Sequence, residues 1–496
     1  MFNKLSKDQE LAIKNINEFL DSDEHQVFIL TGPAGSGKTT IISQIIKENS
    51  NPYRKFVLLA TTGKAASIIY RKTGIPAQTV HSTIYVPDNN FVDEKTGHIR
   101  FKLKDISPPD NTIYIVDEAS MMKAQGTRDY FISFGTGNTL SDFFYYIGNS
   151  KVIFIGDRYQ LPPVKEDFSA ALHPEFLQKE FGKKTMSFEL KNIHRYPKNS
   201  GIYLLSKHYR HLINNDSTHK TTFKKSSDVI DYTQHEWKDF TKSYIDYILK
   251  NGLGSSVIIV PRNKLAQQYT HAIRENIFIA KERKGCLFAF LRFLGIRFTK
   301  KGEQVTHTKI GKSSEVPLLA GEPVMVFKNN YKYNLMNGDR IYVHKILEDN
   351  IRVERLPFTY MRVVFRNTPD YEQGITKTFE TYVLKDFIFK ENAFLEKTDT
   401  QKIMIYLSYK ARERRNKNHF LNYKEHLMEL MKKDPYFNAL LVKHAYAITC
   451  HKAQGDEWDE VFLHIEHFKE HDYRWLYTAL TRAEKKVHRY FNYVRW

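Results

Sequence analysis

The chain has 496 residues, of which 41% are hydrophobic and 14% aromatic. These values are typical of a folded protein and exclude a disordered one, and the length suffices for about two to four domains. The 75 Lys and Arg residues outnumber the 56 Asp and Glu residues, so the formal net charge is +19 and the pI is about 9.4. Such an excess favours a polyanionic partner, nucleic acid above all, although a generally basic proteome would also produce it.

The number of cysteines and the length of the apolar runs indicate the cellular compartment of the protein. The two cysteines, Cys286 and Cys450, are too few for a disulfide framework or a zinc site, and they fit a reducing cytosol. The polar start of the chain lacks the apolar core of a signal peptide. The apolar run 286–298 is too short to cross a bilayer and contains Arg292 and Arg297. We therefore expect a cytoplasmic protein that does not contact a membrane.

The first predicted element is a helix over residues 1–20, with Ser6 as its N-cap and apolar residues at helical spacing. Gln9 lies in the first turn of this helix. Its amide offers both a donor and an acceptor, which the edge of an adenine base requires, although most glutamines at helix starts are simply solvated. Gln9 is therefore a candidate adenine contact.

A phosphate-binding loop follows this helix. The apolar run 27–30 predicts a buried strand and the isoleucines after Thr40 predict a helix, so GPAGSGKTT lies between a strand and a helix. A G-x-x-x-x-G-K-[ST] match is meaningful in this context, because the glycines let backbone N–H groups turn toward a phosphate. Lys38 would contact the β- and γ-phosphates, and the Thr39 hydroxyl would bind Mg²⁺. The sequence predicts that a nucleoside triphosphate is bound by Gly32, Pro33, Ala34, Gly35, Ser36, Gly37, Lys38, Thr39 and Thr40.

Polar residues follow the next predicted strand, 55–60, in the sequence ATTGKAA, and TVHST comes after it. Hydroxyls and a lysine at the carboxyl end of a parallel strand lie where α/β sheets bind ligands, and they suit phosphate. Thr62 and Lys64 are therefore candidate phosphate contacts, whereas His81 alone would more often be a packed histidine. Residues 84–110 carry turn signals around an alternating polar and apolar run, which predicts an inserted β-hairpin.

Two more predicted strands end in catalytic candidates. After an apolar strand come Asp117, suited to a Mg²⁺ shell, and Glu118, suited to orienting and deprotonating water. After the strand 151–155 comes GDRYQLPPV, whose double proline fixes a loop that would hold Gln160 beside a terminal phosphate. The segment 121–150 is rich in aromatic residues and glycines, and we predict a helix and a loop there without an assigned role.

The second half repeats the α/β pattern around a different insertion. A strand over 256–260 runs through Asn263 into a helix, and the pattern resumes later with ITCHKAQGDEWDEV and YTALTRA. Between them, the β-rich stretch 310–400 predicts barrel-like strands inserted into an α/β domain. The basic helical stretch 409–433 is either a solvated helix or a surface that faces nucleic acid. Residues 286–310 match no pattern that we can assign.

Eight stretches now stand in order along the chain: GPAGSGKTT, ATTGKAA, TVHST, VDEAS, IGDRYQLPPV, LKNIHRY, ITCHKAQGDEWDEV and YTALTRA. Together they resemble the motifs of superfamily 1 helicases, most closely the RecD-like branch that includes the phage helicase Dda. The resemblance implies an α/β fold with two RecA-like P-loop domains, a small β-hairpin (pin) insertion in the first and a β-rich, SH3-like insertion in the second. The implied ranges are 1–185 for the first domain with its hairpin at 84–110, 186–305 and 440–496 for the second, and 306–439 for the inserted domain with its basic helical segment.

The resemblance also implies roles for the matching positions. Arg195 and Arg482 look like paired arginine fingers from opposite sides of a closing cleft, which would bring positive charge to the transferring phosphoryl group. Glu457 is similar to a residue that contacts the ribose, and Gly455 belongs to the same nucleotide-binding motif. The implied cofactors are ATP and Mg²⁺, and the residues assigned to the metal are Thr39 and Asp117. The implied catalytic residues are Lys38, Glu118, Gln160, Arg195 and Arg482.

For DNA, the resemblance implies backbone contacts by Thr62, Lys64, His81, Asn263, Thr449, His451 and Lys452. Phe101 lies in the hairpin where the related phage helicase carries its strand-separating aromatic, and a packing role is an equally good interpretation. We expect a monomer that couples ATP hydrolysis to 5′→3′ translocation on single-stranded DNA and to duplex unwinding. Its partners would be single-stranded DNA, junctions of single- and double-stranded DNA, and replication or recombination proteins, in the cytoplasm, including that of a phage-infected bacterium.

Two departures and several alternatives stay open. The segment 121–150 is longer than the usual link between the corresponding motifs, and Thr61 stands where many relatives have proline. An RNA or RNA–DNA helicase, or a DNA-stimulated ATPase that translocates without strand separation, would carry the same motifs. A P-loop kinase would not need LTRA or CHKAQG. A non-catalytic DNA-binding protein would not keep Lys38, Glu118 and Arg482 together.

Overall fold

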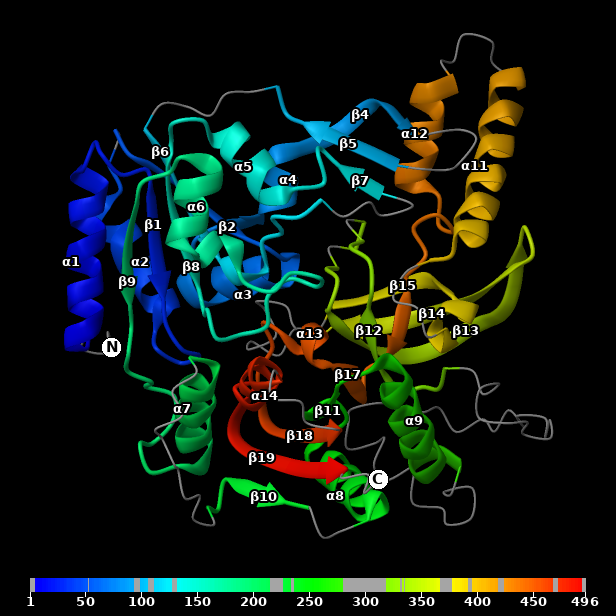
Figure 1. The fold of residues 1–496 in the computed structure, drawn as a ribbon. Coiled ribbons are helices and arrows are strands. Elements are labelled where there is room, and N and C mark those ends of the chain that lie inside the picture. The colour runs from blue at the N-terminus through cyan, green and yellow to red at the C-terminus, as the bar shows by residue number, and fades with distance from the viewer. Residues whose placement is uncertain are drawn as a thin grey trace. The chain divides into compact units, whose positions relative to one another are not determined.

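The computed structural model of the chain describes residues 5–51, 53–92, 99–105, 111–126, 132–214, 226–232, 236–279, 318–330, 332–333, 335–365, 377–390, 395–417, 423–466 and 472–492. The chain forms two compact units (Figure 1). The first contains Met1–Asp228 with Lys469–Glu484, and the second contains Val229–Phe468 with Lys485–Trp496. Each unit holds one sheet with parallel pairing and a second, separate sheet.

The first unit is built around a six-stranded sheet in the order β3-β2-β6-β8-β1-β9, and its strand pairs are parallel. The strands are β1 (Val27–Thr31), β2 (Lys55–Ala60), β3 (Ala77–Thr79), β6 (Thr112–Asp117), β8 (Lys151–Gly156) and β9 (Thr185–Glu189). Strands β1 and β6 are buried along their whole length, as expected of a parallel sheet covered on both faces. The strands predicted from apolar runs in this half are therefore confirmed.

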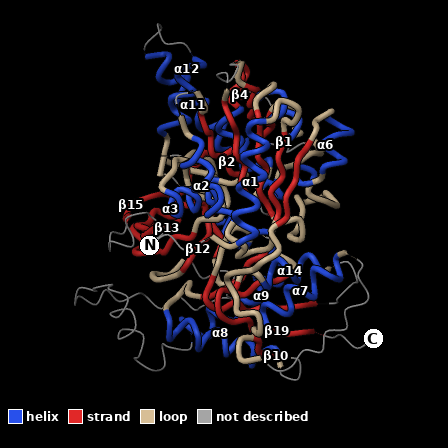
Figure 2. The backbone as a smooth tube through the Cα atoms, turned by 90° about the vertical axis from the view of Figure 1, so that its left-hand side faces the viewer, coloured by secondary structure: helices blue, strands red, loops and turns tan. Residues whose placement is uncertain are grey.

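Helices cover both faces of this sheet because successive strand residues point to opposite sides. The helices of the unit are α1 (Lys7–Asp21), α2 (Lys38–Asn49), α3 (Gly63–Thr73), α4 (Val80–Ile84), α5 (Thr139–Ile147), α6 (Pro174–Phe181), α7 (Gly201–Ile213) and α14 (Tyr473–Leu480). Phe28 and Leu30 share a core with α1, α2 and α3, whereas Val27 and Ile29 share the other core with α4, α5 and α6. Figure 2 shows α1 and α2 next to each other beside the strands of this unit.

A small three-stranded sheet in the order β4-β5-β7 belongs to the same unit. Its strands are β4 (Tyr85–Val92), β5 (Ile99–Leu103) and β7 (Ile132–Phe134). Strands β4 and β5 are antiparallel, so the hairpin predicted within 84–110 is confirmed. Strand β7 pairs in parallel with β5 and comes from the segment 121–150, where we predicted a helix and a loop. The helix is α5, but three residues are too few to show the alternation that would have revealed the strand.

The second unit contains a five-stranded sheet in the order β10-β19-β18-β11-β17. Its strands are β10 (Val229–Asp231), β11 (Ser256–Val260), β17 (Ala447–Thr449), β18 (Trp458–Glu466) and β19 (Ala483–Asn492). Strand β11 pairs in parallel with β17 and β18, and β10 pairs in parallel with β19. The helices of this part are α8 (Trp237–Asn251), α9 (Asn263–Arg274), which continues into a single π turn, and α13 (Cys450–Ala453).

An antiparallel sheet is inserted into this second unit in the order β15-β14-β13-β12-β16. Its strands are β12 (Pro323–Val326), β13 (Arg340–Val353), β14 (Leu356–Phe365), β15 (Lys377–Leu384) and β16 (Val442–His444). The Leu440 N–H, just before β16, donates to the Tyr382 carbonyl in β15 at 2.7 Å, so the two edges of the sheet meet and the strands form a small barrel. The helices α11 (Lys397–Lys417) and α12 (Tyr423–Lys433) lie in the loop that precedes β16. The predicted fold class, two α/β domains with a hairpin and a β-rich insertion, is confirmed.

The compact units do not coincide with the predicted domain ranges. Strand β9 belongs to the first sheet, so that sheet extends beyond residue 185. The first unit also includes Lys469–Glu484, near the end of the chain. The domain assignment stays a prediction, and residues 286–310 lie outside the described residues. Among the helices that the structure describes, none has the length and apolar character that crossing a bilayer needs.

Candidate active site

Three neighbouring strands of the first sheet bring the predicted catalytic motifs to one edge. Thr31, at the end of β1, pairs with Gly156, at the end of β8. Asp117 ends β6, the next strand in the sheet, while Gly32 and Asp157 directly follow β1 and β8. Parallel strands end at the same edge, so motifs that are far apart in the sequence meet there.

The phosphate-binding loop needs its glycines at two positions. Gly35 and Gly37 have φ angles of +79° and +85°, which side-chain-bearing residues rarely adopt. A Cβ atom at Gly35 would lie 2.4 Å from the Cβ of Arg195, and one at Gly37 would lie 2.1 Å from Nε2 of Gln9. The loop is therefore packed closely against two of the residues that we predicted to contact the nucleotide.

Lys38 and Gln9 both hydrogen-bond to carbonyl groups of the loop. Lys38 Nζ donates to the carbonyl oxygens of Gly32 at 2.8 Å and Pro33 at 3.0 Å. Gln9 Nε2 donates to the Ser36 carbonyl at 3.1 Å, and its Oε1 accepts from the Ser6 N–H at 2.9 Å in a capping box. Both ends of the Gln9 amide are thus engaged, and its contact with adenine stays a prediction.

The paired carboxylates lie where β6 ends. Asp117 Oδ1 accepts from the Glu118 N–H at 2.8 Å, and Glu118 has a φ of +52°, a left-handed conformation that costs a non-glycine residue about 1–2 kcal/mol. The Thr61 hydroxyl donates to the Glu118 carbonyl at 3.1 Å and helps to hold this conformation. Burial raises the pKa of the Asp117 carboxyl, and burial together with the Asp117 charge raises the pKa of Glu118 to about 7. The charges of Arg482 and Lys38 act in the opposite direction on Glu118, so both cations lie close to this carboxylate.

Asp157 connects the motif after β8 to the other end of the chain. Its Oδ1 accepts from the Tyr159 N–H at 3.0 Å, and its Oδ2 accepts from the Tyr477 hydroxyl at 2.7 Å. The same hydroxyl accepts from the backbone N–H of Ala34, in the phosphate-binding loop, at 3.4 Å. Asp157 is 1% exposed and Tyr477 is fully buried. A buried bridge thus joins α14, the loop and the motif after β8.

Further contacts fix α14 against the same motif. The Thr478 hydroxyl accepts from the Leu161 N–H at 2.9 Å. The Arg474 guanidinium donates to the carbonyl oxygens of Arg158 and Gln160. These bonds explain why Lys469–Glu484 forms one compact unit with the first sheet.

The two predicted arginine fingers are both held beside α14. Arg195 Nη1 donates to the Thr481 carbonyl at 3.2 Å. Arg482 is 3% exposed, and its Nε and Nη2 donate to the Thr478 carbonyl at 3.0 Å and to the Thr481 hydroxyl at 3.2 Å. The resemblance implied that these arginines come from opposite sides of a cleft. In this structure both belong to the first unit, because α14 packs on α7 and bonds to the loop and to the motif after β8.

The donor groups of this edge suit a triphosphate and a divalent cation. Ser36 Oγ and Gln160 Oε1 are buried without a hydrogen-bond partner in the described part of the chain, which is costly unless a ligand provides one. Backbone N–H groups, an ammonium and two guanidinium groups attract phosphate. The Thr39 hydroxyl and the Asp117 carboxylate are the oxygen ligands that Mg²⁺ takes, usually with waters and substrate phosphates completing its shell. The residues present therefore fit ATP and Mg²⁺.

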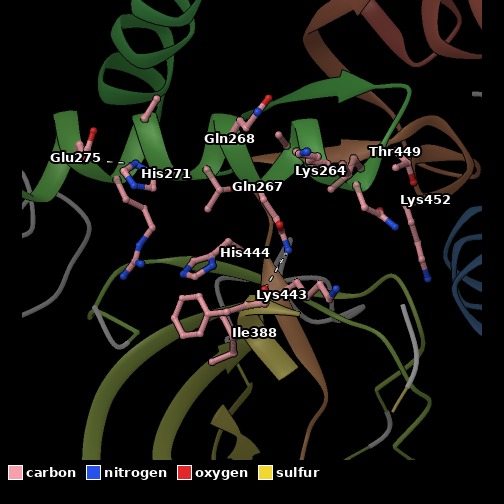
Figure 3. Close-up of a pocket in the computed structure, with 18 of the residues that line it drawn as sticks. Lys264, Gln267, Gln268, His271, Glu275, Ile388, Lys443, His444, Thr449 and Lys452 are labelled. Carbon is pink, nitrogen blue, oxygen red and sulfur yellow. Dashed lines mark hydrogen bonds and ion pairs between the residues drawn. The ribbon is translucent and has the colours of Figure 1, made fainter. Parts of the chain in front are cut away.

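A second site is a cavity of about 610 Å³ in the second unit, between α9 and the inserted barrel (Figure 3). Three of the predicted DNA contacts line it: Asn263, Thr449 and Lys452. Lys452 Nζ donates to Asn337 Oδ1 at 2.8 Å and lies 4.5 Å from the ring centroid of Phe327. Burial lowers the pKa of Lys452 to about 8. This is a desolvated ammonium that an anion would stabilise.

The other predicted DNA contacts are placed separately. In the first unit, Thr62 caps α3 by accepting from the Ala65 N–H at 3.1 Å, and Lys64 is buried. His81 packs 5.0 Å from Phe134, and burial lowers its pKa to about 4, so it is neutral at pH 7. In the second unit, His451 is exposed on α13.

Two nucleotide-binding candidates, Gly455 and Glu457, belong to the second unit. Gly455 has a φ of +80°, in the turn that follows α13. Their contact with the nucleotide stays a prediction.

Comparison with known proteins gives the family. Residues 4–232 match the family described as AAA domain, and residues 444–488 match the UvrD-like helicase C-terminal domain. The chain is similar to the ATP-dependent DNA helicase Pif1 of Campylobacter jejuni, with 23% identity over 97% of this chain and 89% of that protein. It is also similar to the RecBCD enzyme subunit RecD of Buchnera aphidicola, with 23% identity over 92% of this chain and 68% of that protein. The chain belongs to the superfamily 1 helicases of the RecD/Pif1 type.

Two further comparisons concern this helicase. The ATP-dependent DNA helicase Dda of phage T4 is 28% identical to it over 36% of this chain and 38% of that protein. Among solved structures, the Pif1 helicase from Bacteroides in complex with ADP-AlF3 and ssDNA is 18% identical, over 98% of this chain and 92% of that chain, with a TM-score of 0.45. As a superfamily 1 helicase, the protein hydrolyses ATP.

Sequence reasoning did not single out the tyrosine that joins the motifs of this helicase. Tyr477 was visible only as the first letter of YTALTRA, and Asp157 only as part of IGDRYQLPPV. Nothing in either stretch indicates that the two side chains meet, because they are 320 positions apart in the sequence.

Proposed function

We propose that this ATP-dependent DNA helicase moves 5′→3′ along single-stranded DNA and opens duplex DNA ahead of it. The observation that carries the proposal is the gathering of the five predicted catalytic residues in the first unit, around one sheet edge: Lys38, Glu118, Gln160, Arg195 and Arg482. A site that adds carboxylates and two arginines to a phosphate-binding loop is suited to hydrolysing a phosphoanhydride, not only to binding it.

In the hydrolytic step, each residue has a distinct task. Lys38 and the N–H groups of the loop neutralise the β- and γ-phosphates. Glu118 orients the attacking water and takes its proton, and Gln160 contacts the terminal phosphate with its buried amide. Arg195 and Arg482 place positive charge beside the phosphoryl group as it leaves. Thr39 and Asp117 would hold Mg²⁺, which would supply further charge neutralisation on the phosphates.

The contacts of α14 support a coupling of this step to movement. Tyr477 joins the phosphate-binding loop to Asp157, and Arg482 of the following turn lies close to Glu118. A change in the state of the nucleotide would therefore act on α14, and β19, which follows it, belongs to the sheet of the second unit. Alternating grip on DNA by the two α/β domains would turn this change into steps.

Two observations support DNA as the track. The relatives from Campylobacter jejuni and phage T4 are named as DNA helicases. Asn263, Thr449 and Lys452 all line the cavity of the second unit. The desolvated ammonium of Lys452 would be stabilised by contact with a phosphodiester. The direction, 5′→3′, rests on the resemblance to the RecD-like branch.

Unwinding of forked substrates with a 5′ or a 3′ single-stranded tail, in DNA and RNA versions, tests this proposal. We expect strand separation of the 5′-tailed DNA fork that requires ATP and Mg²⁺, and no separation when Glu118→Gln replaces the wild type. Preferential opening of 3′-tailed forks would overturn the direction, and equal activity on RNA would overturn the choice of track. ATP hydrolysis that DNA does not stimulate would overturn the motor itself.

A further inference from the structure

The hairpin formed by β4 and β5 is not free-standing. An isolated two-stranded hairpin is marginally stable in water, and a third strand or a packed face is needed to hold it. Strand β7 supplies that third strand, with Ile99 opposite Ile132 and Phe101 opposite Phe134. The Gly135 N–H then extends the ladder by donating to the Phe101 carbonyl at 2.9 Å. Part of the segment 121–150, to which the sequence assigned no role, thus adds an edge to the hairpin.

Aromatic rings join this third strand to the hairpin and to the body of the unit. Phe134 stacks on Phe101 with the ring centroids 4.8 Å apart and the planes 18° apart. Phe134 also lies 5.3 Å from the ring of Tyr85 and 5.0 Å from that of His81. Tyr85 belongs to the core that α5 shares with the central sheet, and Phe101 and Phe134 pack against that core. Phe101 is therefore a packing residue of the hairpin base in this structure.

A buried carboxylate fixes the same junction. Asp142, on α5, is 2% exposed. Its Oδ2 accepts from the Tyr85 hydroxyl at 2.7 Å and from the Thr136 N–H at 3.0 Å, and its Oδ1 accepts from the Thr136 hydroxyl at 2.8 Å. Gly135 makes room for this carboxylate, because a Cβ there would lie 2.2 Å from Asp142 Oδ2. A carboxyl group this deeply buried needs hydrogen-bond partners, and these three donors supply them.

Helix α5 anchors the carboxylate to the strands that carry the catalytic motifs. Phe143 contacts Tyr114 of β6 and Phe154 of β8, with ring centroids 5.8 and 6.1 Å apart. Strands β6 and β8 lead to Asp117 and Asp157. A load on the hairpin base would therefore pass through Asp142 and α5 into the central sheet.

We propose that residues 132–147 are a brace that holds the hairpin rigid as the wedge for strand separation, with Asp142 and Phe134 as its positioning residues. This inference rests on the proposed function, since a wedge matters only for an enzyme that opens a duplex. A rigid wedge converts each step along the single strand into an opened base pair, whereas a loosened one lets the enzyme step and the duplex close again. The brace therefore determines the number of base pairs opened per ATP and not the rate of hydrolysis on single-stranded DNA.

The variant Phe134→Ala, which removes the stacked ring, tests the brace. We expect about a fivefold fall in base pairs opened per ATP on a forked DNA, steeper for GC-rich than for AT-rich duplexes, because each lost aromatic pair weakens docking a few-fold. ATP hydrolysis on single-stranded DNA should stay within about twofold of the wild type. Phe134→Tyr, which keeps the ring, should restore the yield. The matched control is Tyr145→Ala, on α5 but 80% exposed, which should change nothing.

The hydrogen bonds of the brace are tested by Tyr85→Phe and Asp142→Asn. An asparagine replaces one accepting oxygen by an N–H donor, so it cannot accept from all three donors, whereas Tyr85→Phe removes the bond between these two side chains outright. We expect their effects on the yield to be less than additive in the double variant. Amide hydrogen exchange over residues 99–103, measured without DNA, should rise in Phe134→Ala.

The outcomes separate two failures. If the wild type opens no fork, the proposed function fails and the brace falls with it. If the wild type opens forks and Phe134→Ala does so with an unchanged yield per ATP, or with unchanged amide exchange, only the brace is wrong. A parallel loss of single-strand ATPase and unwinding would also overturn it, because that result means a general structural role.

Discussion

The two candidate sites hold their charged groups in different ways. At the edge of the first sheet, Lys38 donates to two carbonyl groups and Arg482 to a carbonyl and a hydroxyl, and Asp157 accepts from two donors. In the cavity of the second unit, Lys452 bonds to one amide oxygen and lies over a ring, and burial lowers its pKa to about 8. The first site fixes its cations in place, and in the second the described residues bring no anion to the Lys452 ammonium.

This difference matches what each proposed ligand demands. Phosphoryl transfer needs charges held in place before the reaction, because reorganising them during the step would add to the barrier. A track that slides through a site needs contacts that form and break easily, and single phosphate contacts are weak and sensitive to salt. The comparison therefore predicts large effects from substitutions at the sheet edge and small ones in the cavity.

The largest expected effect is at Glu118. Glu118→Gln keeps the size of the side chain but cannot take a proton, so we expect ATP turnover to fall by about 10³-fold, within the range for loss of a general base. The affinity for ATP should change little, because the carboxylate is not a phosphate ligand. Steady-state hydrolysis measures the turnover, and equilibrium binding of a fluorescent ATP analogue measures the affinity. A fall in affinity that accounts for the lost turnover would contradict the assigned role.

A smaller effect is expected at Tyr477. Tyr477→Phe removes the hydroxyl that accepts from the Ala34 N–H and donates to Asp157, and leaves both groups buried. The cost of such unsatisfied groups predicts about a tenfold fall in kcat, with KM for ATP changed less. The neighbouring Thr478→Val, which removes the acceptor of the Leu161 N–H, is the matched comparison on the same helix. Equal kcat values for wild type and Tyr477→Phe would show that the bridge does not serve turnover.

The sheet edge was largely predictable from the sequence, and its internal bonds were not. GPAGSGKTT and VDEAS can be recognised in the sequence because each motif is a short continuous stretch with a predicted strand before it. The bond between Tyr477 and Asp157 depends on how α14 packs, which no local pattern encodes. The same reason hid β7, since its only signal is the partner strand that it meets in space.

Ambiguous residues were resolved by packing. Phe101 could be read from the sequence as a strand-separating aromatic or as a packing residue, and the structure shows it stacked on Phe134. Taken alone, His81 was expected to be a packed histidine more often than a DNA contact. Its ring lies in the same aromatic cluster. The sequence pattern could not distinguish these roles, because the same aromatic residue types both pack in a core and stack on bases.

The smallest effect, and the sharpest test of the comparison, concerns Lys452 and pH. Burial lowers the pKa of this ammonium to about 8, so the group is mostly charged at pH 7 and mostly neutral at pH 9. A phosphate contact favours the charged form, so the affinity for single-stranded DNA should fall as the pH rises through this range, by about three- to tenfold for one lost contact. Lys452→Arg keeps its charge throughout and should flatten the difference between pH 7 and 9, while Lys452→Ala should bind weakly at both and lower the salt slope by about one. Fluorescence anisotropy with a labelled oligonucleotide measures all three, and an identical pH profile for wild type and Lys452→Arg would remove Lys452 from the DNA site.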